Sequence, residues 1–516
     1  MVGGPARIAP SAWFALIVLA LANLLNYLDR YILSILAQSI KADLRLDDAQ
    51  LGFLLGTAFA VFYAVVGIAM GRIADRLSRK RLMAFGLALW SAMTALGGAA
   101  TNFLWLSVAR IGVGVGEATA NPCSHALLSQ VFPAKRRATA LAIYLGGTYI
   151  GSALALIVGG LVLENWTVSC GAVPGDFACA IAPWQAALIL VGLPGLPLSL
   201  LVLKIHEPLR RKQETEGSLQ VVGFEMAAAL PPFTLVVLHR LGGVRSLLRN
   251  LVIAAIATAV ATALVLLTGD LAQWAAVMLG AYAVATWAQV QSLRDRPLFV
   301  LTFGDPAFML SLVGAALIAC VAGAVSVWAA PYAMRELAMS PVEAGASLGL
   351  LHAGGALFGV VLGGLATDRL KQSDRRAPIW VSIVSITAQM PFIVAMMLAE
   401  SSSAFLLAFT GFAVVSSIWS GAFAALIQDL VLDRMRGAAA SAFSLFSIVV
   451  ASGIGPYWAG KVSAVTGSLQ TGLFSVLVLG PVALVILTLA LSRVKQASPE
   501  SRLARAAAAG EVNEVP

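Results

Sequence analysis

The sequence predicts an all-α protein that crosses a membrane many times. Hydrophobic residues make up 59% of its 516 residues, whereas charged residues make up only 11%. A soluble protein carries about 25% charged residues, so this chain lacks the polar side chains needed to cover a surface that faces water. Apolar stretches of about 20 residues, the length that crosses a bilayer as a helix, recur along the chain. Together these observations indicate a polytopic helical membrane protein.

Fourteen stretches have the length and apolar character of a membrane span. The first continues well beyond the apolar region of a signal peptide, so we expect it to be retained. The fourteen lie at about 12–37, 50–70, 82–100, 103–130, 138–163, 183–203, 250–268, 272–290, 307–330, 344–366, 378–399, 404–427, 438–460 and 470–492.

Lysine and arginine are distributed unevenly between the two sets of loops. If the N-terminus is cytoplasmic, 28 of the 34 basic residues lie in cytoplasmic loops and tails, and only four lie in outer loops. The other two, Arg30 and Arg110, lie within spans. Because positive charge accumulates on the cytoplasmic side, the sequence predicts an even number of spans and two cytoplasmic termini. A bacterial inner membrane is the expected location.

The four cysteines fit this orientation. Cys170 and Cys179 share one outer loop, on the oxidising side of such a membrane, and we expect them to form a disulfide. Two free thiols are the alternative. Cys123 and Cys320 lie within spans and are expected in the core.

An internal repeat divides the chain into related halves. The segment from Gly71 through Asp75, Arg76, Arg79 and Lys80 follows the second span. A similar segment with Asp368 and Arg369 follows the tenth, and the basic pair Arg136-Arg137 before the fifth span is echoed by Arg434 and Arg436 before the thirteenth. The repeat predicts a six-helix bundle over 1–203, a cytoplasmic connector with two inserted spans over 204–306, a second six-helix bundle over 307–492, and a weakly ordered cytoplasmic tail over 493–516.

The first span contains an unusual polar segment, Asn26-Tyr27-Leu28-Asp29-Arg30-Tyr31. A charged side chain at the centre of a membrane helix costs about 2.5–3.5 kcal/mol, so adjacent acid and base indicate function or pairing. Asn26, Tyr27 and Arg30 share one helical face, with Asp29 on its flank. We expect this face to point into the bundle or a water-filled path; a purely structural ion pair is the alternative.

The fourth span carries a second acid and base, Arg110 and Glu117. They lie seven residues apart and therefore share a helical face, which Asn121 continues. The glycines between them permit close approach of a neighbouring helix. They are not interpreted as a dinucleotide loop, because no strand precedes them.

These residues suggest a mechanism for coupling. Burial favours a protonated carboxylic acid, whereas a nearby arginine favours the carboxylate, so a small rearrangement can load or release a proton. We expect Asp29 and Glu117 to be the coupling carboxylates. Arg30 and Arg110, with Asn26, Tyr27 and Asn121, are the expected substrate-binding residues, because guanidinium binds phosphate in bidentate fashion. A structural Arg110–Glu117 lock is the alternative.

The parallel repeat and the motif Gly71-x-x-x-Asp75-Arg76-x-x-Arg79-Lys80 resemble the major facilitator superfamily. This resemblance implies its fold, with two inserted helices. It also implies that the motif residues, together with Asp368, Arg369 and Arg436, form a conformational gate. The segments around Asp29-Arg30 and Arg110 to Glu117 are similar to Spinster-like transporters, which are associated with sphingosine-1-phosphate and lysophospholipids.

The function predicted from residues and resemblance is proton-coupled transport of an anionic amphiphile by alternating access. Its expected partners are protons, the bilayer and a lysophospholipid or sphingosine-1-phosphate-like lipid, with the protein acting as a monomer. Proton-coupled symport of a small organic anion, such as a sugar acid, is the alternative, and an uncoupled scramblase or sensor is a third. The sequence contains no nucleophile triad, phosphate-binding loop or metal-ligand cluster, so we expect no enzyme activity, cofactor or metal, and no nucleic-acid binding.

Overall fold

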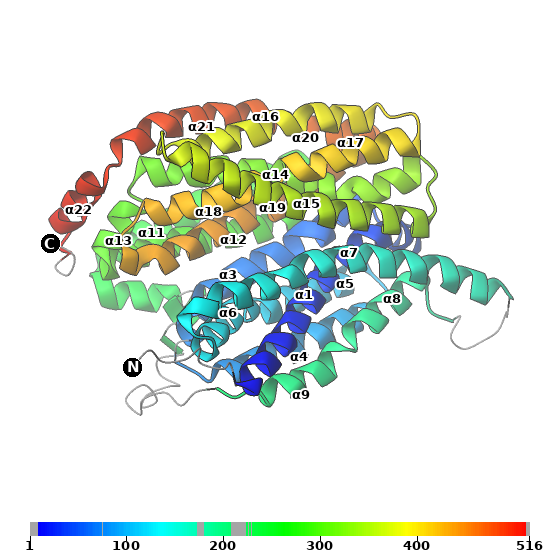
Figure 1. Ribbon diagram of the computed structural model, residues 1–516, viewed down its shortest axis with the longest axis horizontal. Helices are drawn as coiled ribbons and strands as arrows, with labels where there is room; N and C mark the ends of the chain where they lie inside the picture. Colours follow the sequence, from blue (N-terminus) through cyan, green and yellow to red (C-terminus); the bar gives the residue numbers. More distant parts are fainter. Residues whose placement is uncertain are drawn as a thin grey trace, which may run out of the picture. The chain divides into compact units, whose positions relative to one another are not determined.

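The computed structural model describes residues 9–74, 76–172, 180–207, 223–224, 226–228 and 230–511. All regular elements in these residues are helices, which are labelled in Figure 1. Twelve of the helical segments described are long and apolar enough to cross a membrane. The predicted class, an all-α polytopic membrane protein, is confirmed.

The other two predicted spans, at 82–100 and 103–130, are also helical but are not among these twelve. Helix α4 (Arg79–Gly97) begins with three basic residues. The next span is divided into α5 (Phe103–Glu117) and α6 (Ala120–Val131). Helix α4 begins with basic residues, and α5 and α6 are each shorter than a membrane span. These features explain why the two predicted spans are not counted among the twelve.

The chain folds into two compact units. The first comprises Met1–Arg45, Ala69–Glu225 and Ser340–Gly349, and the second comprises Leu46–Ile68, Met226–Met339 and Leu350–Pro516. Nearly all of the second predicted span, 50–70, thus belongs to the second unit, and a short segment of the chain's second half, Ser340–Gly349, belongs to the first.

The first unit is built around α1 (Pro10–Leu44) and α7 (Ala134–Ala172), which pack along each other. A Cβ atom at Gly151 of α7 would lie 2.3 Å from the carbonyl oxygen of Leu24 in α1. Only glycine permits this approach, as expected where small residues bring membrane helices together. The other complete helices of this unit are α4, α5, α6, α8 (Pro183–Gly192) and α9 (Gly195–Leu203).

The second unit contains the larger number of helices. They are α2 (Asp48–Gly52), the π-helical turn η1 (Phe53–Thr57) and most of α3 (Ala58–Ala74), then α11 (Thr234–Thr268), α12 (Leu271–Arg294), α13 (Arg296–Leu301), α14 (Pro306–Glu336), most of α15 (Pro341–Lys371), α16 (Ala377–Met397), α17 (Ser402–Val415), α18 (Trp419–Asp429), the 3₁₀ turn η4 (Asp433–Met435), α19 (Arg436–Thr466), α20 (Leu469–Val476), α21 (Leu479–Gln496) and α22 (Pro499–Ala508).

A buried ion pair joins α2 to α14 within this unit. Arg335 donates from Nη1 to Oδ2 of Asp48 at 2.7 Å and from Nη2 to Oδ1 at 2.5 Å. Ser463 of α19 donates to the same carboxylate at 2.6 Å. Three helices thereby satisfy one buried acid, which is 4% exposed.

The two inserted spans, α11 and α12, differ in burial. In the most apolar stretch of α11 no residue is buried within the protein, whereas 39% of the residues in the corresponding stretch of α12 are buried. Gln273 of α12 is buried; its Nε2 donates to the carbonyl of Gly453 in α19 at 2.9 Å, and its Oε1 accepts from the Thr57 hydroxyl at 2.7 Å. Helix α12 is therefore attached to the second unit by polar contacts, and α11 presents its apolar surface outward.

Helix breaks recur at corresponding places in the two repeats. The fourth span is divided between α5 and α6, and the twelfth is divided between α17 and α18. Likewise, the sixth span is divided between α8 and α9, and the last between α20 and α21. Both halves of the chain therefore contain two interrupted spans.

The expectation of a weakly ordered tail is wrong for residues 499–508. Helix α22 begins after Ser498, whose hydroxyl accepts a hydrogen bond from Ser501 N and so caps the helix. Arg505 forms an ion pair with Asp305 at 3.0 Å and donates to the carbonyl of Val300 at 3.0 Å. These tertiary contacts order a segment whose composition alone predicts disorder.

Candidate functional site

Four charged side chains from two helices meet inside the first unit. Asp29 and Arg30 come from the middle of α1, and Arg110 and Glu117 come from α5. Asp29, Arg110 and Glu117 are 1%, 3% and 0% exposed. The structure therefore brings together the four residues that the sequence singles out.

Glu117 is paired with Arg30. Nη2 of Arg30 donates to Oε2 of Glu117 at 2.8 Å, and the Arg30 side chain remains 22% exposed. Glu117 is the last residue of α5, immediately before the break that leads to α6. Its carboxylate thus lies where the helix is interrupted and contacts the partly exposed guanidinium of Arg30.

Asp29 is held by different groups. Oγ1 of Thr94 in α4 donates to Oδ2 of Asp29 at 3.2 Å. Nη1 of Arg110 donates to the backbone carbonyl of Asp29 at 3.3 Å. Arg110 therefore reaches α1 from α5 and lies beside Asp29, which gives the α5 cation a contact outside its own helix.

The cluster is electrically neutral when all four groups are ionised, which reduces the cost of burying them. A lone buried charge is expensive, whereas a paired one is tolerated. Oδ1 of Asp29 and Oε1 of Glu117 nevertheless have no hydrogen-bond partner among the described residues. Each carboxyl group thus has one oxygen at which a proton can reside without breaking a hydrogen bond to a described neighbour.

The predicted substrate-binding residues lie on α1, α5 and α6. The Tyr27 ring contacts the Arg30 guanidinium, whose central carbon is 4.9 Å from the ring centre. Asn26 is buried, and Asn121 is exposed and accepts a hydrogen bond from the Tyr144 hydroxyl at 3.1 Å. Arg30, Tyr27 and Asn121 are therefore more accessible than Asn26 and Arg110.

Sequence reasoning missed one polar residue beside the cluster, Thr94, and assigned no contact to Asn23. Thr94 contacts Asp29, and Asn23 of α1 donates to the carbonyl of Tyr144 at 2.8 Å and to the hydroxyl of Thr148 at 3.1 Å. Ser91 and Thr94 lie three residues apart in an otherwise apolar span, so a search for hydroxyl pairs on one helical face identifies Thr94. Asn23 lies on the polar face already recognised.

The proposed gate segment after α3 contacts the end of α9. Glu207 accepts hydrogen bonds from the Ser78 hydroxyl at 2.6 Å and from the backbone nitrogen of Arg79 at 2.9 Å. Lys80 donates from Nζ to the carbonyl of Ile205 at 3.2 Å. A carboxylate at the start of α4 suits the positive end of that helix. Glu207 was not predicted, because its segment carries no motif.

The remaining predicted gate residues have varied surroundings. Gly71 and Arg76 are exposed, as are Asp368 and Arg369, and Asp75 lies outside the described residues. Arg436 pairs with Asp433 at 2.8 Å. The predicted Cys170–Cys179 disulfide also falls on side chains outside the described part of the chain, while Cys123 and Cys320 are buried as expected.

Comparison with known proteins identifies the family of this chain. The sequence matches the Major Facilitator Superfamily over residues 19–456. It is 28% identical over 461 residues to an MFS-type efflux pump from Mycolicibacterium smegmatis, covering 89% of this chain and 85% of the pump. It is 26% identical over 469 residues to human protein spinster homolog 1, covering 86% of this chain and 72% of the human protein.

A solved structure has the same fold. It is a bacterial homolog of the human lysosomal transporter Spinster, crystallised in an inward-facing and unoccupied conformation. The TM-score is 0.71 at 22% identity, covering 96% of this chain and 100% of that one. The chain belongs to the major facilitator superfamily of membrane transporters and is similar to its Spinster-type members.

Proposed function

We propose that this protein is a proton-coupled secondary transporter that moves an anionic amphiphile by alternating access. The observation that carries the proposal is the buried Glu117 carboxylate, paired at 2.8 Å with a partly exposed Arg30. An intramembrane acid paired with a base marks an ion or substrate pathway in membrane proteins. The neighbouring Asp29 and Arg110 provide a second acid and base in the same cluster.

Proton and substrate compete for Arg30 in this scheme. A proton on Glu117 removes the negative charge that holds the guanidinium of Arg30, which then donates to an anionic head group instead. Guanidinium offers parallel N–H donors that match a phosphate or carboxylate. Arg110, which is 3% exposed, remains beside Asp29 and keeps that part of the cluster neutral. Asp29 serves as the second proton-accepting group.

The amphiphile is preferred because of the surroundings of the charges. The other predicted substrate-binding side chains, Asn26, Tyr27 and Asn121, are uncharged amide and aromatic groups. One charged head and a long apolar tail suit such a lining. Relatives named for efflux and for lysosomal transport support a transporter role for this chain.

The proposal includes a topology. By the distribution of Lys and Arg, both termini face the cytoplasm of a bacterial inner membrane, and the protein acts as a monomer. The segments around Arg79 and around Asp368 and Arg369 form contacts that break as the transporter changes state. A disulfide between Cys170 and Cys179 belongs to the outer loop.

The substrate class is tested with purified protein in liposomes that enclose a pH-sensitive dye. Addition of oleoyl lysophosphatidylglycerol is expected to move protons, and addition of galactonate is not. Protein-free liposomes correct for lysolipid leakage, and liposomes with Glu117→Gln protein report the dependence on the site. A response to galactonate alone would reject the amphiphile and favour the small-anion symporter. No response to either, with lipid movement independent of a pH gradient, would indicate an uncoupled scramblase.

A further inference from the structure

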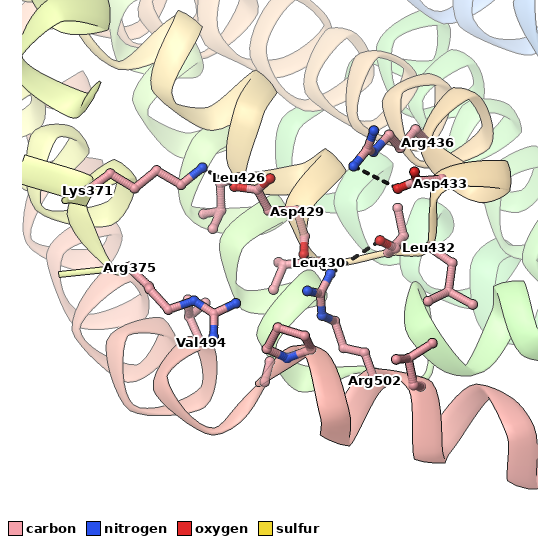
Figure 2. A pocket seen from close by; sticks show the side chains of 14 residues that line it. Lys371, Arg375, Leu426, Asp429, Leu430, Leu432, Asp433, Arg436, Val494 and Arg502 are labelled. Carbon is pink, nitrogen blue, oxygen red and sulfur yellow. Dashed lines mark hydrogen bonds and ion pairs between the residues drawn. The ribbon is translucent and has the colours of Figure 1, made fainter. Parts of the chain in front are cut away.

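A second polar site lies in the second unit, far along the chain from the buried cluster. A pocket of about 440 Å³ is bounded by the end of α15, the segment after α18 and the start of α22 (Figure 2). Its charged lining residues are Lys371, Arg375, Asp429, Asp433, Arg436 and Arg502. Four bases and two acids leave two positive charges in excess.

The two acids are already neutralised within the pocket. Lys371 pairs with Asp429, and Arg436 pairs with Asp433 at 2.8 Å. Arg375 forms no hydrogen bond or ion pair with another residue that the structure describes, and Figure 2 shows its guanidinium directed toward the interior of the group. Within the pocket lining the excess positive charge therefore belongs to Arg375 and Arg502, and the exposed Glu500 outside this lining lies close enough to offset part of it.

Arg502 is held in place by backbone groups rather than by an acid. Its Nη1 donates to the carbonyl oxygens of Asp429 and Val431, the latter at 3.2 Å. Its Nε is buried and has no hydrogen-bond partner among the described residues. Burial lowers the pKa of Arg502, and the nearby charge of Arg375 lowers it further. The local potential is thus positive at a guanidinium that retains an unused donor.

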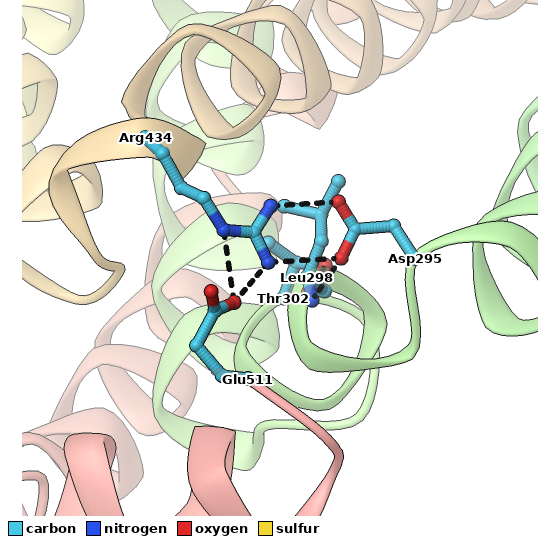
Figure 3. A network of polar contacts seen from close by, with 5 residues as sticks. All are labelled: Asp295, Leu298, Thr302, Arg434 and Glu511. Carbon is cyan, nitrogen blue, oxygen red and sulfur yellow. Dashed lines mark hydrogen bonds and ion pairs between the residues drawn. The ribbon is translucent and has the colours of Figure 1, made fainter. Parts of the chain in front are cut away.

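Contacts C-terminal to Arg502 fix α22 before any ligand binds. Figure 3 shows Arg434 between two acids: its Nη1 donates to Asp295 at 2.9 Å, and its Nε donates to Glu511 at 2.8 Å. Arg505, one helical turn after Arg502, pairs with Asp305. The wall of the pocket formed by α22 is therefore preorganised, which reduces the entropy lost on binding.

We propose that this pocket binds the phosphate group of an anionic molecule, with Arg375 and Arg502 as its principal ligands. A phosphate group carries one to two negative charges and offers several acceptor oxygens, which matches two guanidinium groups that have no ion pair among the described residues. Basic pockets at the cytoplasmic ends of membrane helices bind anionic lipid head groups. A soluble phosphate has the same chemistry, so the source is decided by experiment.

The test uses full-length protein purified in detergent and native mass spectrometry. The lipid probe is dioleoyl phosphatidylglycerol, with dioleoyl phosphatidylcholine as the lipid of no net charge. Inorganic phosphate is the soluble probe, and its binding is measured as an increase in the thermal unfolding temperature. The variants are Arg375→Gln and Arg502→Gln. The matched control is Arg493→Gln, because Arg493 is exposed near the C-terminal end of α21 and does not line the pocket.

Loss of one charge-assisted contact is expected to weaken probe binding by about tenfold in either pocket variant and not in the control. If the lipid shows this pattern, the site takes a lipid head group; if inorganic phosphate shows it, the site takes a soluble phosphate. Arg375→Gln leaves the α22 contacts intact, so it stays informative if Arg502→Gln unfolds the helix. Equal binding of both probes to Arg375→Gln and Arg493→Gln proteins would overturn the proposal.

Discussion

Arg30 of α1 donates a 2.8 Å hydrogen bond to Glu117 of α5, although 87 residues separate them in the chain. The acid is completely buried, and the base is about one-fifth exposed. This asymmetry assigns different tasks to the pair. Glu117 has no access to solvent through its own surface, whereas Arg30 can leave the pair to meet another anion.

Replacing Arg30 tests its role in anion recognition. Arg30→Lys keeps the charge but loses the planar fork, so the apparent affinity for oleoyl lysophosphatidylglycerol is expected to fall by about tenfold. Competition transport assays in liposomes measure this change. Uncharged monooleoylglycerol should bind the wild type and the variant equally. A lysine variant with unchanged affinity would show that bidentate contact at residue 30 is not used.

The Asp48–Arg335 pair is expected to couple α2 and α14 energetically. Asp48→Asn and Arg335→Gln should each lower the free energy of unfolding, because each removes one charge of a pair whose acid is buried. The double variant should be less destabilised than the sum of the two, with a coupling energy of about 1–3 kcal/mol. Unfolding in detergent measures all four proteins. Additive effects would mean that the two residues act independently.

The inserted hairpin is expected to depend on Gln273. Gln273→Leu removes hydrogen bonds to Gly453 and Thr57, at a cost of about 1 kcal/mol, since such bonds average about 0.6 kcal/mol in membranes. Leu266→Ala should have little effect, because Leu266 of α11 is 81% exposed. Thermal unfolding compares the two variants. The role of Gln273 would be contradicted if both variants unfolded like the wild type.

A pH effect is expected in the loop between α15 and α16. Hydrogen bonds from Arg376 lower the pKa of Asp374 from its ordinary value of 3.8 to about 2. The pair therefore stabilises the folded state fully above pH 3.8, and this contribution disappears as the pH falls toward 2. Because both side chains are about one-third exposed, solvent screening keeps this contribution small.

Asp374→Asn should consequently unfold slightly more easily than the wild type at pH 6 and equally at pH 2. Thermal unfolding at a series of pH values gives the comparison. Glu336→Gln, a change at an exposed acid of α14, should show no such convergence. A difference between Asp374→Asn and the wild type that persisted at pH 2 would point to a role other than the ion pair.

Much of the buried cluster could be predicted because charge in a membrane span is rare. Asp29, Arg30, Arg110 and Glu117 stand out in apolar runs, and their burial follows from the cost of exposing them to lipid. Their pairing did not follow, because helical periodicity places Arg110 and Glu117 on one face and favours their mutual lock. The ion pair of Glu117 with Arg30 depends on the rotation of α1 against α5, which no local pattern encodes.

The order of the C-terminal segment also could not be predicted from local sequence. An Ala-rich sequence with mixed charge suggests a disordered tail, yet α22 is fixed by Arg502 and Arg505. Their partners are Asp305 and backbone carbonyls in segments distant in sequence. Amino-acid composition predicts only the local conformational preference of a segment. The order of α22 depends on its tertiary contacts.

The most direct measurement compares exchange with gradient-driven transport in Glu117→Gln liposomes. Substrate exchange at equal pH needs only the conformational change, whereas accumulation against a pH gradient needs the proton-carrying acid. We expect Glu117→Gln to retain exchange of labelled lysophosphatidylglycerol and to lose accumulation, while Glu400→Gln, at an exposed acid after α16, retains both. If Glu117→Gln protein still accumulated substrate in response to a pH gradient, Glu117 would not be the coupling group.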